Sequence, residues 1–235
     1  MILLYSLVGG VRMSWTQVRN IVIWTVLISL SAYYLYRGLL YRFITPDQLG
    51  PTLFHKQLWY FSHVLFALPV LVGGPLQFSK KLRTTWPEIH RLLGKIYVFG
   101  AVVAALTAIY LGGYVGEYEG SKLPIVLLAL LWLFFTLGAW RSAVHRQFDV
   151  HRVFMIRSYG LALVLVWLRL MGDVPPDVMF FYIEDQAVRD TTLEWMSWVI
   201  PLIAMEIYLS WWPMLRRRKS HNSSTATRAT FQQAE

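Results

Sequence analysis

The sequence predicts an all-α, polytopic integral membrane protein with about six transmembrane helices. Two features of its composition predict this fold class. Of the 235 residues, 56% are hydrophobic and only 15% are charged, whereas soluble domains carry about 25% charged residues. The 11 tryptophans and 13 tyrosines are typical of proteins whose aromatic rings lie at the lipid–water boundary. We therefore expect the lipid bilayer to be the main partner of the chain.

Apolar segments of the right length are the third observation. A transmembrane helix needs about 20 mostly apolar residues, and six segments meet this requirement, near residues 20–40, 55–78, 92–113, 122–141, 152–171 and 193–214. They predict an N-terminal segment 1–19, a membrane domain 20–214 and a basic, disordered tail 215–235. Spans two to five, at residues 55–171, are expected to form a four-helix core. The apolar start of the chain is too short to span and follows no basic stretch, so no cleaved signal peptide is expected.

The distribution of basic residues predicts the orientation. If the six spans alternate, 16 of the 22 lysines and arginines fall on the side of the two termini. Most acidic residues fall on the other side. Positively charged loops stay in the cytoplasm. The sequence therefore predicts a multi-pass inner-membrane protein of a bacterium, with both termini cytoplasmic.

Several classes of function find no support in the sequence. The absence of cysteine excludes disulfides, thiolate catalysis and cysteine-ligated metals. Neither a Gly-x-Ser-x-Gly nor a His-Glu-x-x-His motif is found, and no glycine-rich phosphate loop is found either. The net charge of +9 is accounted for by one basic membrane face, so no nucleic-acid partner is expected.

Three predicted spans carry a histidine and small residues along one helical stripe. The stripes are His63, Ala67, Val70, Gly74 and Gln77 in the second span, His90, Gly94, Tyr97 and Ala101 in the third, and His151, Met155, Ser158 and Ala162 in the fifth. Intramembrane polar residues usually face the interior of a bundle. Small residues beside them allow a helix or a flat ligand to approach closely.

Two interpretations of these stripes stay open. In the first, His90 and His151 lie at the same depth and are the axial ligands of a b-type haem. Arg91, Arg152 and Arg157 then supply positive charge for its propionates, while His63, Gln77 and Tyr97 line the slot. In the second, favoured by the pattern alone, the same residues anchor helix ends at the membrane surface and no cofactor is bound.

Two ion pairs are predicted within the membrane domain. Glu206 is the one carboxylate expected near mid-membrane, and Arg157 is long enough to reach it if the fifth and sixth spans are neighbours. Arg169, near the outer end of the fifth span, is expected to pair with Asp173 one helical turn later.

Three segments resemble a known family. "HVLFALPVLVGGPLQF", "RTTWPEIHRLLGKIYV" and "VHRVFMIRSYGLALVLVWLRL" resemble the bacterial predicted membrane proteins catalogued as domain of unknown function 2306. The pattern of that family falls on His63, Gly74–Gln77, His90–Tyr97, His151–Ser158 and Arg169, within residues 60–171.

A more distant similarity is to transmembrane b-type cytochromes, which hold haem between histidines on separate spans. That similarity implies a haem-binding redox protein, with room for at most one haem held by two histidines. The alternative is a cofactor-free membrane protein with a transport, sensing or structural role. A third possibility is a membrane enzyme that acts on a lipid or quinone, so a small-molecule or quinone substrate is a candidate partner.

Overall fold

The computed structural model describes residues 14–44, 53–115 and 119–215. These residues form helices and no strand, which confirms the predicted all-α, polytopic fold. The long helices are α1 (Trp15–Ile44), α2 (Leu53–Gln77), α4 (Pro87–Ala108), α5 (Glu119–Val144), α6 (Phe148–Ala162), α7 (Val164–Gly172) and α9 (Gln186–Glu206). Two π-helical segments, η2 (Ile109–Tyr114) and η3 (Ile207–Trp211), continue α4 and α9, and α3 (Lys80–Thr85) and α8 (Pro176–Met179) are short connections.

The described helices account for all six predicted spans. Five are long and apolar enough to cross a membrane, and α6 and α7 together make a sixth that bends by 41°. The bend falls at Leu163, between the two helices. No proline marks this position, so the sequence did not predict the break. The predicted tail lies outside the described residues beyond Leu215.

The four helices predicted as the core pack against one another. The pairs α2–α4, α4–α5, α5–α6 and α2–α6 are all in contact. α2 and α4 approach closely at Gly100, where a Cβ atom would lie 2.7 Å from the backbone oxygen of Phe66. Only glycine fits at this position, because such a contact is shorter than real Cβ atoms tolerate.

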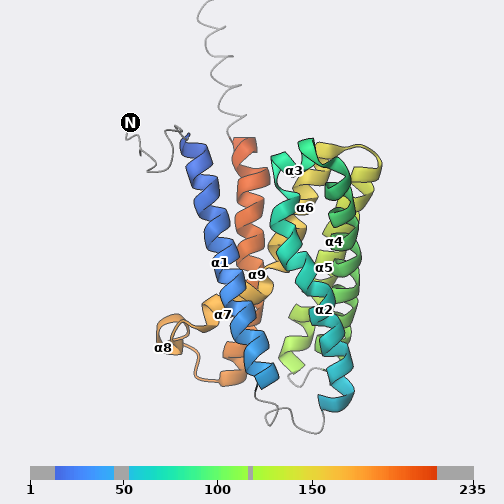
Figure 1. The fold of residues 1–235 in the computed structure, drawn as a ribbon. Helices are drawn as coiled ribbons and strands as arrows, with labels where there is room; N and C mark the ends of the chain where they lie inside the picture. Colours follow the sequence, from blue (N-terminus) through green and yellow to red (C-terminus); the bar gives the residue numbers. More distant parts are fainter. Residues whose placement is uncertain (1–13, 45–52, 116–118, 216–235) are drawn as a thin grey trace, which may run out of the picture.

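The last helix is also part of the bundle. α9 contacts α5, α6 and α7, whereas α1 packs against α7 and α2 at one side of the molecule (Figure 1). Figure 1 also shows that the start of α1, the end of the last helix and α3 lie at one end of the bundle. The chain therefore crosses the bundle an even number of times, as the predicted alternation of spans requires.

A partly buried ion pair joins α9 to α6, as predicted. The Nε and Nη2 atoms of Arg157 donate to the two carboxylate oxygens of Glu206, the second over 2.8 Å. Ser210 donates to the same carboxylate over 2.9 Å. The guanidinium group also lies over the rings of Phe135 and Phe154, 5.7 and 5.9 Å from their centres. Aromatic rings thus cover the guanidinium group, and the carboxylate accepts hydrogen bonds from Arg157 and Ser210.

The prediction of a second ion pair, between Arg169 and Asp173, is wrong. Asp173 accepts hydrogen bonds from Arg37 over 3.1 Å and from Tyr34 over 3.0 Å, both on α1. Arg169 forms no ion pair with a residue whose side chain the structure describes. The reason is that α7 ends at Gly172, and Asp173 then faces the neighbouring helix. A tertiary contact has replaced the local pair that helical spacing predicts.

Candidate functional site

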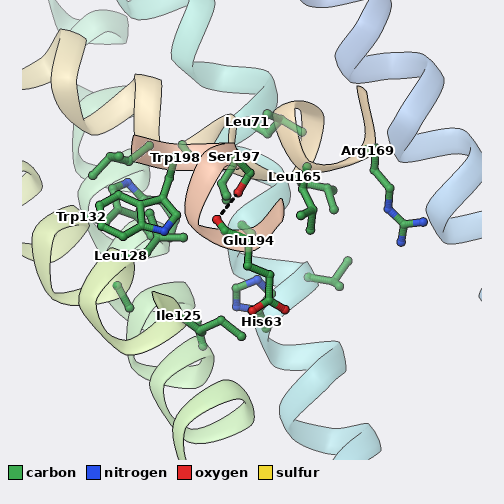
Figure 2. Close-up of a pocket in the computed structure, with 18 of the residues that line it drawn as sticks. His63, Leu71, Ile125, Leu128, Trp132, Leu165, Arg169, Glu194, Ser197 and Trp198 are labelled. Atoms are coloured by element: carbon green, nitrogen blue, oxygen red, sulfur yellow. Dashed lines mark hydrogen bonds between the residues drawn. The ribbon is translucent and has the colours of Figure 1, made fainter. Parts of the chain in front are cut away.

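A cavity of about 350 Å³ lies within the helical bundle. It is enclosed by α2, α5, α7 and α9, with further contributions from α1, α4 and α6 (Figure 2). Most of its wall is leucine, alanine and tryptophan. Ligand pockets in proteins have about 300–1,000 Å³ and are mostly apolar with few polar groups. The cavity therefore has the size and composition of a site for a small apolar molecule.

His63 places one polar atom in this wall. Its Nδ1 atom lies 2.9 Å from the backbone oxygen of Ala104 and 3.3 Å from Oγ1 of Thr107. A carbonyl oxygen only accepts, so the proton of the neutral imidazole is on Nδ1. The hydroxyl of Thr107 already donates to backbone oxygens of its own helix. The Nε2 atom of His63 is therefore left with a free lone pair, which makes it a hydrogen-bond acceptor.

Glu194 on α9 provides the carboxyl group of the cavity. Its Oε2 atom is buried, and among the described residues it has no hydrogen-bond partner. The hydroxyl of Ser121 lies beside this carboxyl group and is likewise unpartnered within the described chain. Ser197 donates instead to the backbone oxygen of Glu194 over 2.7 Å, the dashed line in Figure 2. Ser121 is therefore the neighbouring side chain that can donate to this carboxyl group, while Oε2 has no hydrogen bond within the described chain. A charge inside a membrane is costly unless it is paired, and no basic side chain among the described residues pairs with Glu194.

Aromatic rings form the wall on the α5 and α9 side. Trp132 and Trp198 are 8% and 4% exposed, and both line the cavity. The ring of Trp198 is held against Trp195, with centres 5.4 Å apart. The indole nitrogen of Trp198 is buried and has no partner among the described residues. These rings are rigid aromatic parts of the same cavity wall as Glu194.

One edge of the cavity is open. Leu165 on α7 lines the cavity and is 37% exposed, although it lies in a membrane-spanning segment. Arg169 stands one turn further along α7, and Figure 2 shows its side chain extending toward α1 and away from Glu194. Leu165 and Arg169 are thus the exposed residues of the wall on α7.

The residues predicted for the cofactor mostly lie elsewhere, near α3. Only His63 lines the cavity. Gln77 is 7% exposed, its amide nitrogen is unpartnered within the described chain, and its Oε1 atom would lie 3.6 Å from a Cβ atom on Gly94. Nδ1 of His151 lies at hydrogen-bonding distance, 2.9 Å, from the backbone oxygen of Ala139. His90 is near enough to His151 for the two to interact electrostatically. Arg91 and Arg152 are exposed.

The stripes of His90 and His151 are joined further along their helices by a polar contact. Tyr97, 1% exposed, lies 3.0 Å from the hydroxyl of the fully buried Ser158, and Ser158 lies 2.8 Å from Thr136. The small residues thus bring α4, α5 and α6 together around this contact. Tyr97 follows His90 by seven residues, or about 10 Å along the helix, so the stripes are closed at that level.

Four residues of the cavity wall were not predicted as site residues: Glu194, Ser197, Trp132 and Trp198. Glu194 is one of the acidic residues that the predicted alternation of spans puts on the side opposite the termini. The signal was its position on the helix. α9 begins at Gln186, so Glu194 lies about 12 Å, or two turns, inside it.

The fold and the cavity define a helical, polytopic membrane protein with a ligand-sized pocket inside its membrane domain. The chain belongs to the family described as "Predicted membrane protein (DUF2306)", because the model of that family matches residues 60–209, which include every helix of the predicted core. The match begins just before His63 and ends beyond Glu206, so it includes both sides of the cavity. No curated protein and no solved structure matches the chain.

Proposed function

We propose that this protein binds a lipid-soluble small molecule, whose polar part contacts His63 and Glu194. One observation supports this most strongly, the buried and unpartnered Oε2 atom of Glu194 in the wall of an apolar cavity. Unsatisfied buried polar atoms are rare in native proteins and often mark functional sites. A ligand with a hydrogen-bond donor would satisfy the carboxyl group.

The ligand would enter from the bilayer. The exposed side of Leu165 lies in a membrane-spanning segment, so the open edge of the cavity faces acyl chains. A quinol belongs to this class of ligand, because its hydroxyl group can donate to the free lone pair on Nε2 of His63. A transport or sensing role is compatible with binding at such a site.

Binding of a neutral probe tests the proposal. N-phenyl-1-naphthylamine is lipid-soluble, has one N–H donor and becomes more fluorescent in apolar surroundings. We expect saturable binding to the purified protein in detergent, above the signal of empty micelles. Ala67→Leu should weaken binding, because Ala67 lines the cavity one turn from His63. Ala143→Leu is the control, since Ala143 is also a partly buried helical alanine but does not line the cavity.

Haem binding stays a prediction of the sequence. It is tested by the absorption spectrum of the purified protein, as isolated and after reduction with dithionite. A Soret band that His90→Ala or His151→Ala removes or shifts would establish the haem. A colourless protein, expressed with ample haem, would rule it out.

We further propose that the end of the bundle with α3 faces the cytoplasm of a bacterial cell. Exposed basic residues gather there, on α3, at the start of α4 and around the turn between α5 and α6 (Lys80, Lys81, Arg83, Arg91, Arg141, Arg146 and Arg152). Basic residues stay on the cytoplasmic side of inner-membrane proteins. Since α1 starts and the last helix ends at this same end, both termini would be cytoplasmic.

A further inference from the structure

We propose that the ligand is a lipid-soluble organic cation, such as a protonated amine with apolar substituents, and that Glu194 is its counter-ion. This inference rests on the proposed function and narrows it to one class of ligand.

The charges around the cavity favour a cation. Glu194 is the one acidic residue among the described residues that line it. Arg169 is the one lysine or arginine in the same set, and its side chain extends away from the carboxyl group (Figure 2). It therefore does not neutralise Glu194. The wall offers a carboxylate without an internal counter-ion, which is the complement of a positively charged ligand.

The hydrogen-bonding groups point the same way. Nδ1 of His63 donates to the backbone oxygen of Ala104, so its Nε2 atom accepts. Oε2 of Glu194 accepts as well, and it has no partner among the described residues. The wall also holds two donors, the indole N–H groups of Trp132 and Trp198, which have no partner among the described residues. An ammonium group with apolar or aromatic substituents would donate to Nε2 of His63 and Oε2 of Glu194.

The aromatic wall adds a third feature. Trp132 and Trp198 line the cavity with Glu194 and are almost completely buried. The faces of tryptophan rings attract cations, and the attraction is stronger where water is excluded. An apolar cavity that needed only to hold a neutral molecule would be served by aliphatic residues. Tryptophan rings and a carboxylate in the wall of one cavity are both groups that attract organic cations.

Two probes of equal shape and opposite charge provide the test. Tetraphenylphosphonium is a lipid-soluble cation, and tetraphenylborate is an anion of nearly the same size. Binding of each to the full-length protein in detergent is measured by equilibrium dialysis, with empty micelles of matched concentration subtracted. We expect the cation to bind at least about tenfold more tightly than the anion, a difference of about 1.4 kcal/mol.

Variants assign the charge preference to one residue. Glu194→Gln should abolish the preference for the cation and keep the binding of neutral N-phenyl-1-naphthylamine. Glu184→Gln removes the same charge from an exposed residue outside the cavity and should keep the preference. If Glu194→Gln does not fold, the ratio measured on the unaltered protein still decides whether the site selects cations.

The outcomes separate the inference from the proposed function. Equal affinities for the two ions, or tighter binding of the anion, would overturn the cation while binding of the neutral probe upheld the cavity. A preference that persisted in Glu194→Gln would overturn the role of Glu194. Absence of binding by all three probes would overturn both the inference and the proposed function.

Discussion

The ion pair between Arg157 and Glu206 should be among the strongest single interactions between α6 and α9. The two side chains are 16% and 26% exposed, and two N–H groups of Arg157 bind the carboxylate. Neutralising one partner leaves the other charge unpaired inside the membrane domain. On insertion scales such a charge costs about 2.5–3.5 kcal/mol. We therefore expect Arg157→Gln and Glu206→Gln each to lower the free energy of unfolding by about 2–4 kcal/mol.

The double variant distinguishes a paired from an unpaired arrangement. Two neutral glutamines leave no buried charge, so its loss of stability should be smaller than the sum of the single losses by at least about 1 kcal/mol. Unfolding is followed in mixed micelles of a mild detergent and dodecyl sulfate. Arg141→Gln is the control, because Arg141 is exposed at the end of α5 and should change stability by less than about 0.5 kcal/mol. Additive losses in the double variant would refute the coupling.

Three further outcomes are expected from the packing and the arrangement of the ends. Gly100→Ala should destabilise the protein by about 1–3 kcal/mol, since the new Cβ atom would meet the backbone of α2. Gly73→Ala is the control and should be neutral, because a Cβ atom there has nothing within 4 Å. Equal thermal unfolding of the two variants would argue against the α2–α4 contact. Ser158→Ala should cost about 1–3 kcal/mol, because it removes the shared partner of Tyr97 and Thr136, and an unchanged free energy of unfolding would count against this buried contact. A reporter protein fused after Lys219 should be active in the cytoplasm, and periplasmic activity there would reverse the proposed orientation.

The sequence was sufficient to predict the fold, because each span is an apolar segment long enough to cross a membrane and is bounded by polar or charged residues. Arg157 and Glu206 were predictable as partners for another reason. An unpaired charge inside a membrane is costly, so each residue needs a partner, and the depth of each could be estimated by counting residues from the end of its span. Arg169 and Asp173 lie at a helix end, where Asp173 has tertiary partners within reach. Asp173 binds Arg37 and Tyr34 because α1 packs beside it. The spacing of residues along one helix cannot predict the position of another helix.

The site was less predictable for a physical reason. Small residues next to His90 and His151 can either line a slot or let helices touch, and the sequence pattern is identical in the two cases. In the structure Tyr97 and Ser158 touch. The cavity lies instead where α6 ends and α7 turns away by 41°. No proline at Leu163 indicates this bend in the sequence. Because the bend was not predictable, the sequence could not indicate that Glu194 on α9 and His63 on α2 line one cavity.

Photolabelling tests whether a lipid-soluble molecule occupies the cavity between α2, α5, α7 and α9. The protein in lipid nanodiscs is labelled with a neutral aryl diazirine, with and without excess N-phenyl-1-naphthylamine, and the labelled peptides are identified by mass spectrometry. We expect labelling of residues 161–168 and 194–198, which the competitor suppresses, and labelling of the exposed face of α1 that the competitor does not affect. Labelling of 161–168 and 194–198 that is absent, or as insensitive to competitor as that of α1, would contradict the claim.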